Sequence, residues 1–273
     1  MQFISIFAAV KKMTDIIRPI ATELAQFEAF FAETLKADTE TMASIMHYVL
    51  DTQGKRLRPI LVLLSAKLFG EPNEQTLRSA TFVEMLHSAT IIHDDVVDDA
   101  NQRRGKSSVK AQFGNLSAVL AGDYLLAKAM LLLSKPDDHA ILQEMLSTTA
   151  AMSEGELMQT IVADCVSQSE NPTQYLDIIT RKTALLMRSC CVAGALSVNA
   201  TPEQVNQIAD FGLNFGILFQ LRDDILDGEN TAKAQTLLPE YLQKTLDSLK
   251  SFPASETLEA LRDLTVFCAE RDS

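Results

Sequence analysis

Basic residues are scarce in this chain of 273 residues, in which 24 Lys and Arg stand against 36 Asp and Glu. The formal net charge of −12 argues against a nucleic-acid partner, because proteins that bind a phosphate backbone cluster Lys and Arg on one face. A small polyanionic substrate is compatible with this charge, since bridging cations reverse the local potential. We therefore expect no nucleic-acid binding.

Cysteine is also rare. The chain has four cysteines, namely Cys165, Cys190, Cys191 and Cys268. They have neither the CxxC spacing of a zinc site nor the density of a disulfide scaffold. We expect them to be small buried side chains in the reducing environment of the cytoplasm, where the protein is predicted to reside.

A long apolar run without charge is missing too. The longest run, 116–133, contains Gly122, Asp123 and Lys128, and a charge in the middle of a membrane is costly. This composition predicts a buried core helix and no transmembrane segment. Contact with a lipid surface would then be peripheral.

The amino-terminal end lacks the features of a signal peptide. Residues 1–10 are apolar, but no positively charged start and no small-residue cleavage site accompany them. We expect residues 1–12 to form a flexible extension. Linkers rich in Pro, Gly or Ser are missing as well, so residues 1–273 are predicted to form a single domain.

Alternating, strand-like patterns are not found, whereas apolar residues recur at intervals of three and four almost throughout. Turn-forming residues interrupt this pattern at 70–73, 135–138, 167–172, 199–202 and 252–253. Thr201 and Pro202 are typical of a helix start, since Thr can cap the helix and Pro suits its first position. The chain is therefore predicted to be all-α, as a large bundle of long helices.

Two acidic clusters share the pattern DDxxD. The first consists of Asp94, Asp95 and Asp98, and the second of Asp223, Asp224 and Asp227. Positions i, i+3 and i+4 share a helix face, so the three carboxylates of each cluster are expected to converge. Each cluster follows an apolar run, and such carboxylates need a compensating cation. Oxygen ligands of this kind suit Mg²⁺, which shares its ligand shell with substrate phosphates.

A single DDxxD pattern could also be a solvated, charged end of a helix. Two copies favour a metal-binding role. The first copy is followed by Arg103 and Arg104, which suit a metal-bridged diphosphate, although they could instead neutralise Asp98 and Asp99.

A basic turn with the sequence GKRLRP occupies residues 54–59 and leads into an apolar helix expected over 60–69. Pro59 suits the first turn of this helix. Lys55 and Arg58 flank the helix N-terminus, where backbone N–H groups attract anions. The turn is weak evidence alone, but together with the acidic clusters it indicates a diphosphate site.

These segments together resemble the trans-polyprenyl diphosphate synthase family, specifically the bacterial long-chain octaprenyl or solanesyl type. The matching segments are GKRLRP at 54–59, EMLHSATIIHDDVVDDANQRRGKSS at 84–108, AGDYLLAKA at 121–129, EGELMQ at 154–159, RKTA at 181–184 and FQLRDDILD at 219–227. The resemblance implies a helical bundle of the isoprenoid synthase type with a central substrate cavity, Mg²⁺ as the cofactor, and a homodimer.

The resemblance also implies which residues bind the two diphosphates. That of isopentenyl diphosphate would be held by Lys55, Arg58, His87 and Arg104. The allylic diphosphate would be held by Arg103 and Lys182, with Thr183 and Gln220 lining the same pocket. His87 precedes Asp94 by two helical turns and so lies on a similar face.

The same resemblance implies that Mg²⁺ is bound by Asp94, Asp98 and Asp223, with Asp95, Asp224 and Asp227 as further ligands or as supports of the ligands. Catalysis would depend on Asp94, Asp95, Asp98, Lys182, Asp223 and Asp224. These groups would promote ionisation of the allylic C–O bond. Attack by the double bond of isopentenyl diphosphate and loss of a proton then give a product one unit longer.

The implied function is that of a chain-elongating prenyltransferase, which extends farnesyl diphosphate to a long all-trans polyprenyl diphosphate for quinone side chains. In the family, side chains one turn before the first cluster set the product length. Here these are Ala89 and Thr90, and neither is a bulky aromatic residue. A hexaprenyl to decaprenyl product is expected, with octaprenyl as the central value.

The chain departs from the family pattern after Asp227. In the family, a lid segment with two further GK motifs follows the second cluster, whereas here residues 228–233 lead almost directly to what resembles the final helices. Either the chain lacks part of the lid, or the printed sequence omits it. If the deletion is real, Lys233 is the candidate to replace a missing lysine.

Two alternatives belong to other functional classes. A non-catalytic subunit of a heteromeric prenyl synthase would not need two intact clusters and the GKRLRP turn. A terpene cyclase would not need a site for isopentenyl diphosphate, so Lys55, Arg58 and the second DDxxD argue against it.

Overall fold

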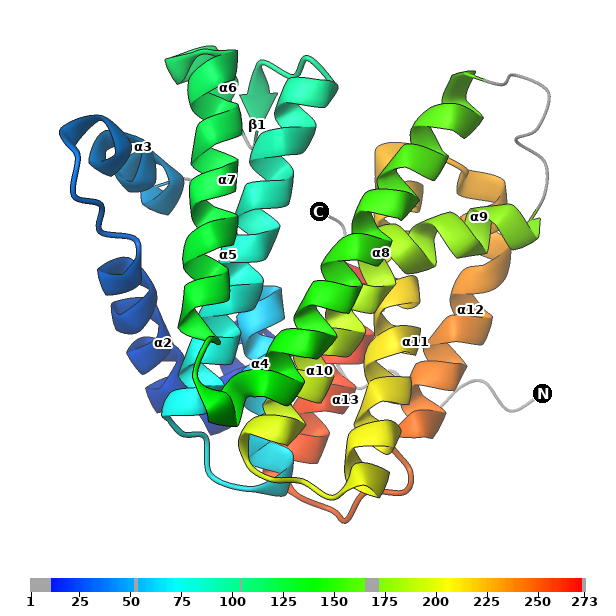
Figure 1. Ribbon diagram of the computed structural model, residues 1–273. Coiled ribbons are helices and arrows are strands. Elements are labelled where there is room, and N and C mark those ends of the chain that lie inside the picture. Colours follow the sequence, from blue (N-terminus) through cyan, green and yellow to red (C-terminus); the bar gives the residue numbers. More distant parts are fainter. Residues whose placement is uncertain (1–10, 52–53, 104, 165–171, 272–273) are drawn as a thin grey trace.

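The computed structural model describes residues 11–51, 54–103, 105–164 and 172–271 (Figure 1). Helices dominate, and the prediction of an all-α fold is confirmed. The described strands, β1 (Gln102–Arg103) and β2 (Lys106–Ser107), form one antiparallel hairpin that pairs Gln102 with Ser107 and Arg103 with Lys106. This hairpin brings the chain back beside the end of the helix that carries the first aspartate cluster.

Connections between the described helices fall at the predicted breaks at 70–73, 199–202 and 252–253. The helices are α1 (Met13–Ile16), η1 (Arg18–Ile20), α2 (Ala21–Thr34), α3 (Glu40–Asp51), α4 (Leu57–Phe69), α5 (Glu74–Val97), α6 (Val109–Phe113), α7 (Asn115–Leu132), η2 (Pro136–Asp138), α8 (His139–Asp164), α9 (Pro172–Ile179), the π-helical η3 (Thr180–Ala184), α10 (Leu185–Ser197), α11 (Pro202–Asp227), α12 (Thr231–Ser248) and α13 (Glu256–Glu270). The two long helices α5 and α11 end at the two aspartate clusters.

Side-chain caps fix where these two helices begin. The Asn73 side chain accepts hydrogen bonds from the backbone N–H groups of Gln75, at 2.8 Å, and Thr76, at 3.1 Å, at the start of α5. Thr201 caps α11 with Pro202 in its first turn, as predicted. Because the starts are fixed, the register of each helix places its DDxxD motif at its far end.

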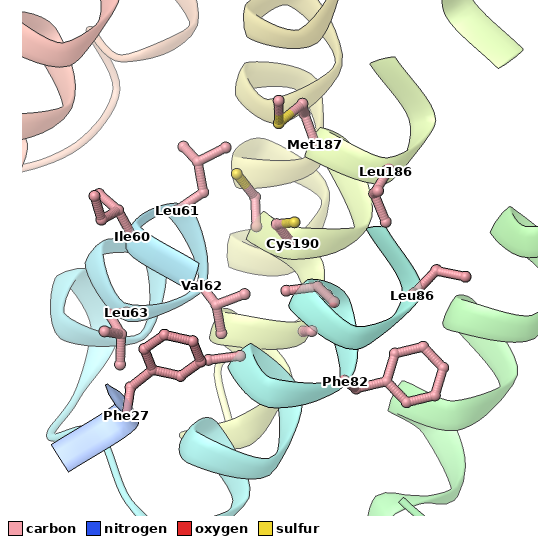
Figure 2. Packing of buried hydrophobic residues seen from close by; sticks show 14 of the residues in the cluster. Phe27, Ile60, Leu61, Val62, Leu63, Phe82, Leu86, Leu186, Met187 and Cys190 are labelled. Atoms are coloured by element: carbon pink, nitrogen blue, oxygen red, sulfur yellow. The ribbon is translucent and has the colours of Figure 1, made fainter. Parts of the chain in front are cut away.

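The core is centred on α4, α5 and α10, which pack against one another (Figure 2). Leu61 and Val62 of α4 point towards Cys190 of α10 in this cluster, which also contains Ile60 and Met187. All of these side chains are at most 2% exposed. Their burial anchors the helix that begins with the basic turn.

The cysteines behave as predicted where the structure describes them. Cys190, Cys191 and Cys268 are buried free thiols, and burial raises the pKa of both Cys191 and Cys268 to about 12. Such thiols are unreactive packing residues. Cys165 lies outside the described residues.

Helix α7 corrects one prediction. It is buried along one face only, where its small residues pack on α5, and 28% of the helix is buried. Its other face exposes Leu116 by 75% and Leu131 by 70%. By length and composition it is the one described helix that could cross a membrane. The prediction of a buried core helix was wrong because both faces are apolar, so the sequence did not reveal that only one has a partner.

Glycines bring the π-helical segment η3 close to its neighbours. A Cβ atom on Gly155 of α8 would lie 2.7 Å from the Cβ of Arg181, and one on Gly216 of α11 would lie 2.5 Å from the Cα of Ala184. Larger residues would therefore push η3 away from α8 and α11. Lys182 and Thr183 lie in sequence between the two contacting residues, Arg181 and Ala184. The close glycine contacts therefore fix the backbone position from which both side chains extend.

The structure describes the predicted N-terminal extension only from residue 11 onward. Residues 1–10 of the predicted extension lie outside the described residues, and Lys11 pairs with Asp263 of α13 at 2.7 Å.

After Asp227, three residues join α11 to α12, with Gly228 at φ +77° and Asn230 at φ +44°. Left-handed backbone at both positions makes this a tight turn. The loss of the lid stays a prediction.

Candidate active site

A cavity of about 760 Å³ joins the two aspartate clusters to the basic turn. The predicted site residues that line it are Lys55, Arg58, His87, Asp95, Arg103 and Asp223. These residues are up to 168 positions apart in sequence, and they come from the basic turn, α4, α5, β1 and α11. One space therefore holds cations from the turn and carboxylates from both clusters.

The basic turn is held by a residue that the sequence did not single out. Arg56, 8% exposed and at φ +54°, donates to Glu28 at 2.9 Å and to Glu84 at 2.6 Å. Its guanidinium also lies 4.6 Å from the centre of the Phe31 ring. Arg56 thus ties the turn to α2 and α5, while its neighbours Lys55 and Arg58 line the cavity.

In the first cluster, Asp95 is the buried member. It is 2% exposed, and its Oδ1 accepts from Arg103 Nη2 at 3.0 Å and Nε at 3.1 Å. Asp98 is exposed at the C-terminal end of α5. The hairpin therefore delivers Arg103 to the carboxylate, as the spacing suggested. Arg104 lies outside the described residues.

Asp94 precedes Asp95 on α5 and has different charged neighbours. Burial, reinforced by the nearby charge of Glu156 on α8, raises the pKa of Asp94 to about 6, although Lys182 opposes the shift. Lys182 Nζ is itself bound to Glu156 Oε2 at 2.7 Å. Glu156 is thus a site residue that sequence reasoning missed, although it lies in the matching segment EGELMQ.

The second cluster also contains one buried carboxylate, that of Asp224, which is 6% exposed. Its Oδ2 accepts from the Tyr175 hydroxyl at 2.5 Å and its Oδ1 accepts from Gln220 Nε2 at 2.7 Å. Gln220 Oε1 in turn accepts from Thr183 Oγ1 at 2.7 Å. The structure therefore joins the predicted residues Thr183 and Gln220 to Asp224, through a network that includes the unpredicted Tyr175.

Asp223 points to the cavity and pairs with Arg271, near the carboxyl-terminal end of the described chain. Burial raises the pKa of Asp223, and Arg271 opposes this rise. The Arg271 guanidinium lies 4.2 Å from the centre of the Phe219 ring. Asp227 is exposed. A lone Arg close to a chain end gave no sequence signal that it reaches an aspartate 48 residues away.

Lys233, the candidate substitute for a lid lysine, lies six residues after Asp227 of the same cluster. It lies on α12, and its Nζ is 6.0 Å from the centre of the Tyr175 ring. The second cluster therefore has a nearby cation on the helix that directly follows it.

The predicted chain-length residues do not line the described cavity. Ala89 is fully buried, and the Thr90 hydroxyl donates to the His87 carbonyl at 2.9 Å. From the same part of α5, the cavity is lined by Ser88, Ile91 and Ile92. The assignment of product length to Ala89 and Thr90 therefore stays a prediction.

The expected convergence of three carboxylates is not observed. Among the residues that the structure describes, no group of three or more His, Cys, Asp or Glu side chains is arranged to hold a metal ion by itself. The physical reason is that adjacent helical residues point about 100° apart, so Asp94 faces Glu156 and Lys182 while Asp95 faces Arg103. A bound cation would need further oxygen ligands, such as those of a diphosphate.

The comparisons with known proteins identify the family of this chain. The model of the Polyprenyl synthetase family matches residues 39–253. The chain belongs to this family. It is 36% identical to the all-trans-nonaprenyl-diphosphate synthase (geranyl-diphosphate specific) of Rhodobacter capsulatus, over 84% of this chain and 69% of that protein. It is 33% identical to the octaprenyl diphosphate synthase of Escherichia coli, over 76% of this chain and 64% of that protein.

The solved structure of a polyprenyl synthase matches the fold of this chain over nearly the full length of the chain. The polyprenyl synthase of Caulobacter crescentus, in a complex with calcium and isoprenyl diphosphate, superposes with a TM-score of 0.86 at 25% identity, covering 97% of this chain and all of that one. The predicted isoprenoid synthase type of fold is thus confirmed. The aligned regions span 58% of the octaprenyl diphosphate synthase of Haemophilus influenzae, so this chain spans less than two thirds of some relatives.

The raised pKa of Asp94 predicts a pH-dependent effect of replacing it. The unshifted value is 3.8, so the folded protein binds this proton more tightly than the unfolded chain, and the charged form costs stability above about pH 6. In metal-free buffer, Asp94→Asn should raise the thermal unfolding midpoint at pH 7.5. The gain should shrink as the pH falls from about 6 towards 4, because the folded state is protonated first, and it should vanish below 3.8, where the unfolded state is protonated too.

The matched control is Asp98→Asn, which removes an exposed carboxylate of the same cluster and should leave the midpoint nearly unchanged. Differential scanning calorimetry across pH 4–8 measures both variants. A midpoint for Asp94→Asn that is lower than wild type at pH 7.5 would contradict the assignment of an uncompensated charge to this position.

Proposed function

We propose that this protein is a chain-elongating prenyltransferase, which adds isopentenyl diphosphate to an allylic diphosphate such as farnesyl diphosphate. The product would be a long-chain all-trans polyprenyl diphosphate of the kind used for quinone side chains. One observation carries the proposal: a single cavity brings together Lys55, Arg58 and Arg103 with Asp95 and Asp223, one carboxylate from each cluster. The names of the relatives, nonaprenyl and octaprenyl diphosphate synthases, support the same reaction class.

The basic side chains of the site would divide between the two substrates, and all of those named below except Lys182 line the cavity. Lys55, Arg58 and His87 line the cavity and would bind the diphosphate of isopentenyl diphosphate. Arg103 and Lys182, each next to a carboxylate of the first cluster or its neighbour Glu156, would bind the allylic diphosphate. Arg271 is an additional cation on the wall near Asp223.

The donor set fits Mg²⁺, whose hard oxygen ligands would be the aspartates of both clusters. Bound Mg²⁺ would supply positive charge to the departing diphosphate. Burial leaves both Asp94 and Asp223 with a raised pKa, which is the behaviour of carboxylates whose charge is incompletely balanced. Calcium in the Caulobacter crescentus complex supports the use of a divalent cation.

The protein's own part in the chemistry would be orientation and exclusion of water. Ionisation of the allylic C–O bond gives a delocalised carbocation, which water would quench. The apolar part of the cavity wall includes Phe31, Leu57, Ile91, Ile92, Phe219 and Phe267. These side chains would keep the cation dry until the double bond of isopentenyl diphosphate attacks it. No side-chain nucleophile is needed, and the departing diphosphate would accept the proton.

The exposed face of α7 supports a homodimer. Leu116, Val119, Leu120 and Leu131 are 39–75% exposed on this helix. An apolar patch of this kind on a helix marks an interaction surface. A second copy of the chain is the proposed occupant, because one isologous contact would cover the face on both subunits. Contact of the cytoplasmic protein with a membrane during product release would be peripheral.

The function is tested with radiolabelled isopentenyl diphosphate, farnesyl diphosphate and Mg²⁺, with the products separated by chromatography. Labelled products of six to ten isoprene units are expected. Absence of elongation would favour the non-catalytic subunit, and consumption of farnesyl diphosphate without label incorporation would favour the terpene cyclase.

The same assay tests the product-length residues. Ala89→Phe should shorten the product, because a ring one turn before the first cluster would block the path of the growing tail. Since Ala89 is fully buried, the partly exposed Thr90→Phe is a second variant with less risk of misfolding. Folded variants that both give the wild-type product would refute this role for the two positions.

The dimer is tested by placing a charge on the α7 face. Leu120→Glu should turn the dimer into a monomer, because a carboxylate would be buried without a partner at the contact. Light scattering coupled to size-exclusion chromatography measures the mass. Ala254→Glu adds the same charge at an exposed position between α12 and α13 and should leave the mass unchanged. A wild-type monomer, or a Leu120→Glu dimer, would contradict the proposal.

A further inference from the structure

The two aspartate clusters share an arrangement that their sequences do not reveal. In each DDxxD motif the second aspartate is the buried one, with Asp95 at 2% and Asp224 at 6% exposure. Each is held by a side chain from a different element, Asp95 by Arg103 of β1 and Asp224 by Tyr175 of α9. The third aspartate, Asp98 or Asp227, is exposed in both.

The chemistry of the two anchors differs. Arg103 brings a positive charge to Asp95, so that pair is close to neutral. The Tyr175 hydroxyl donates to Asp224 without adding charge. The Asp224 carboxylate is therefore held in one orientation by neutral donors and not by an ion pair of the kind that binds Asp95.

We propose that Tyr175 is a positioning residue, which fixes the Asp224 carboxylate so that the second cluster can bind a divalent cation together with a diphosphate. The inference rests on the function proposed above. Its geometric basis is the hydrogen bond of 2.5 Å from the Tyr175 hydroxyl to Asp224 Oδ2.

The opposite side of the same carboxylate is fixed as well. Gln220 Nε2 donates to Asp224 Oδ1 at 2.7 Å, and Thr183 Oγ1 donates to Gln220 Oε1 at 2.7 Å. The amide orientation of Gln220 is self-consistent, because a carboxylate can only accept and a hydroxyl can donate. Asp224 is thus held between η3 and α9. Each of its oxygens has a second lone pair that remains for a ligand.

The surroundings of Tyr175 make the anchor rigid. Its ring is 8% exposed and packs in a small apolar cluster with Leu218, Leu221 and Ala234. A tyrosine fixed in this way loses little further freedom when it binds a carboxylate. The hydroxyl is therefore the one atom of the side chain that packing does not explain.

The test removes only that atom. Tyr175→Phe keeps the ring, so the thermal unfolding midpoint should change little. Binding of Mn²⁺ in the presence of inorganic diphosphate, followed by electron paramagnetic resonance, should weaken by roughly 10- to 100-fold. The turnover number for elongation should fall by a similar factor.

Tyr241→Phe is the matched control. Tyr241 belongs to the same apolar cluster, is 9% exposed, and has Lys244 over its ring as Tyr175 has Lys233. The Tyr241→Phe variant should bind Mn²⁺ in the presence of diphosphate as tightly as wild type does. Wild-type Mn²⁺ binding by Tyr175→Phe would overturn the inference.

A double-mutant cycle shows whether Tyr175 acts through Asp224. The effect of Tyr175→Phe on Mn²⁺ binding should disappear in an Asp224→Asn background, whereas an unchanged effect there would overturn the inference. The Mn²⁺-binding measurements of the single variants and of the double-mutant cycle do not need the elongation assay. If wild type binds Mn²⁺ with diphosphate but does not elongate, the proposed function fails while the role of Tyr175 is still decided by the cycle.

Discussion

The burial of carboxylates whose charge is only partly balanced is the constraint on which the site depends. Two apolar helices, α5 and α11, each end in three aspartates, and burial raises the pKa of both Asp94 and Asp223. The rest of the fold limits this cost. Arg103 and Arg271 each pair with one carboxylate, and Tyr175 fixes another without neutralising it. The cavity wall that results carries the basic side chains that a diphosphate needs, namely Lys55, Arg56, Arg58, Arg103 and Arg271, beside the carboxylates of Glu84, Asp95 and Asp223.

The architecture holds these charges in place through close helix contacts. Core packing of α4 against α10 anchors the basic turn, and Arg56 fixes that turn to α2 and α5. The glycines of α8 and α11 let the π-helical segment approach on both sides, so its adjacent residues have separate partners. Lys182 binds Glu156 on one side, and Thr183 reaches Gln220 on the other. One irregular turn thereby connects both aspartate clusters.

The sequence predicted the features that lie within single elements. Helical periodicity predicted the all-α fold, and the DDxxD and GKRLRP motifs predicted four charged residues of the cavity wall, namely Lys55, Arg58, Asp95 and Asp223. Partners from distant segments were missed, because nothing in the local sequence connects Tyr175 with Asp224 or Arg271 with Asp223. The expected convergence of carboxylates was wrong, since adjacent helical residues point in different directions. The buried face of α7 was also misjudged, because an apolar pattern does not show which face has a partner.

The central claim is that the clusters bind a divalent cation jointly with a diphosphate, and not as preformed metal sites. The most direct measurement is the thermal unfolding midpoint of the metal-free protein with Mg²⁺ alone, with inorganic diphosphate alone, and with both. Ligands that bind only the folded state raise the midpoint, so Mg²⁺ and diphosphate together should raise it by more than the sum of their separate effects. No shift with both ligands, or the full shift with Mg²⁺ alone, would contradict the account.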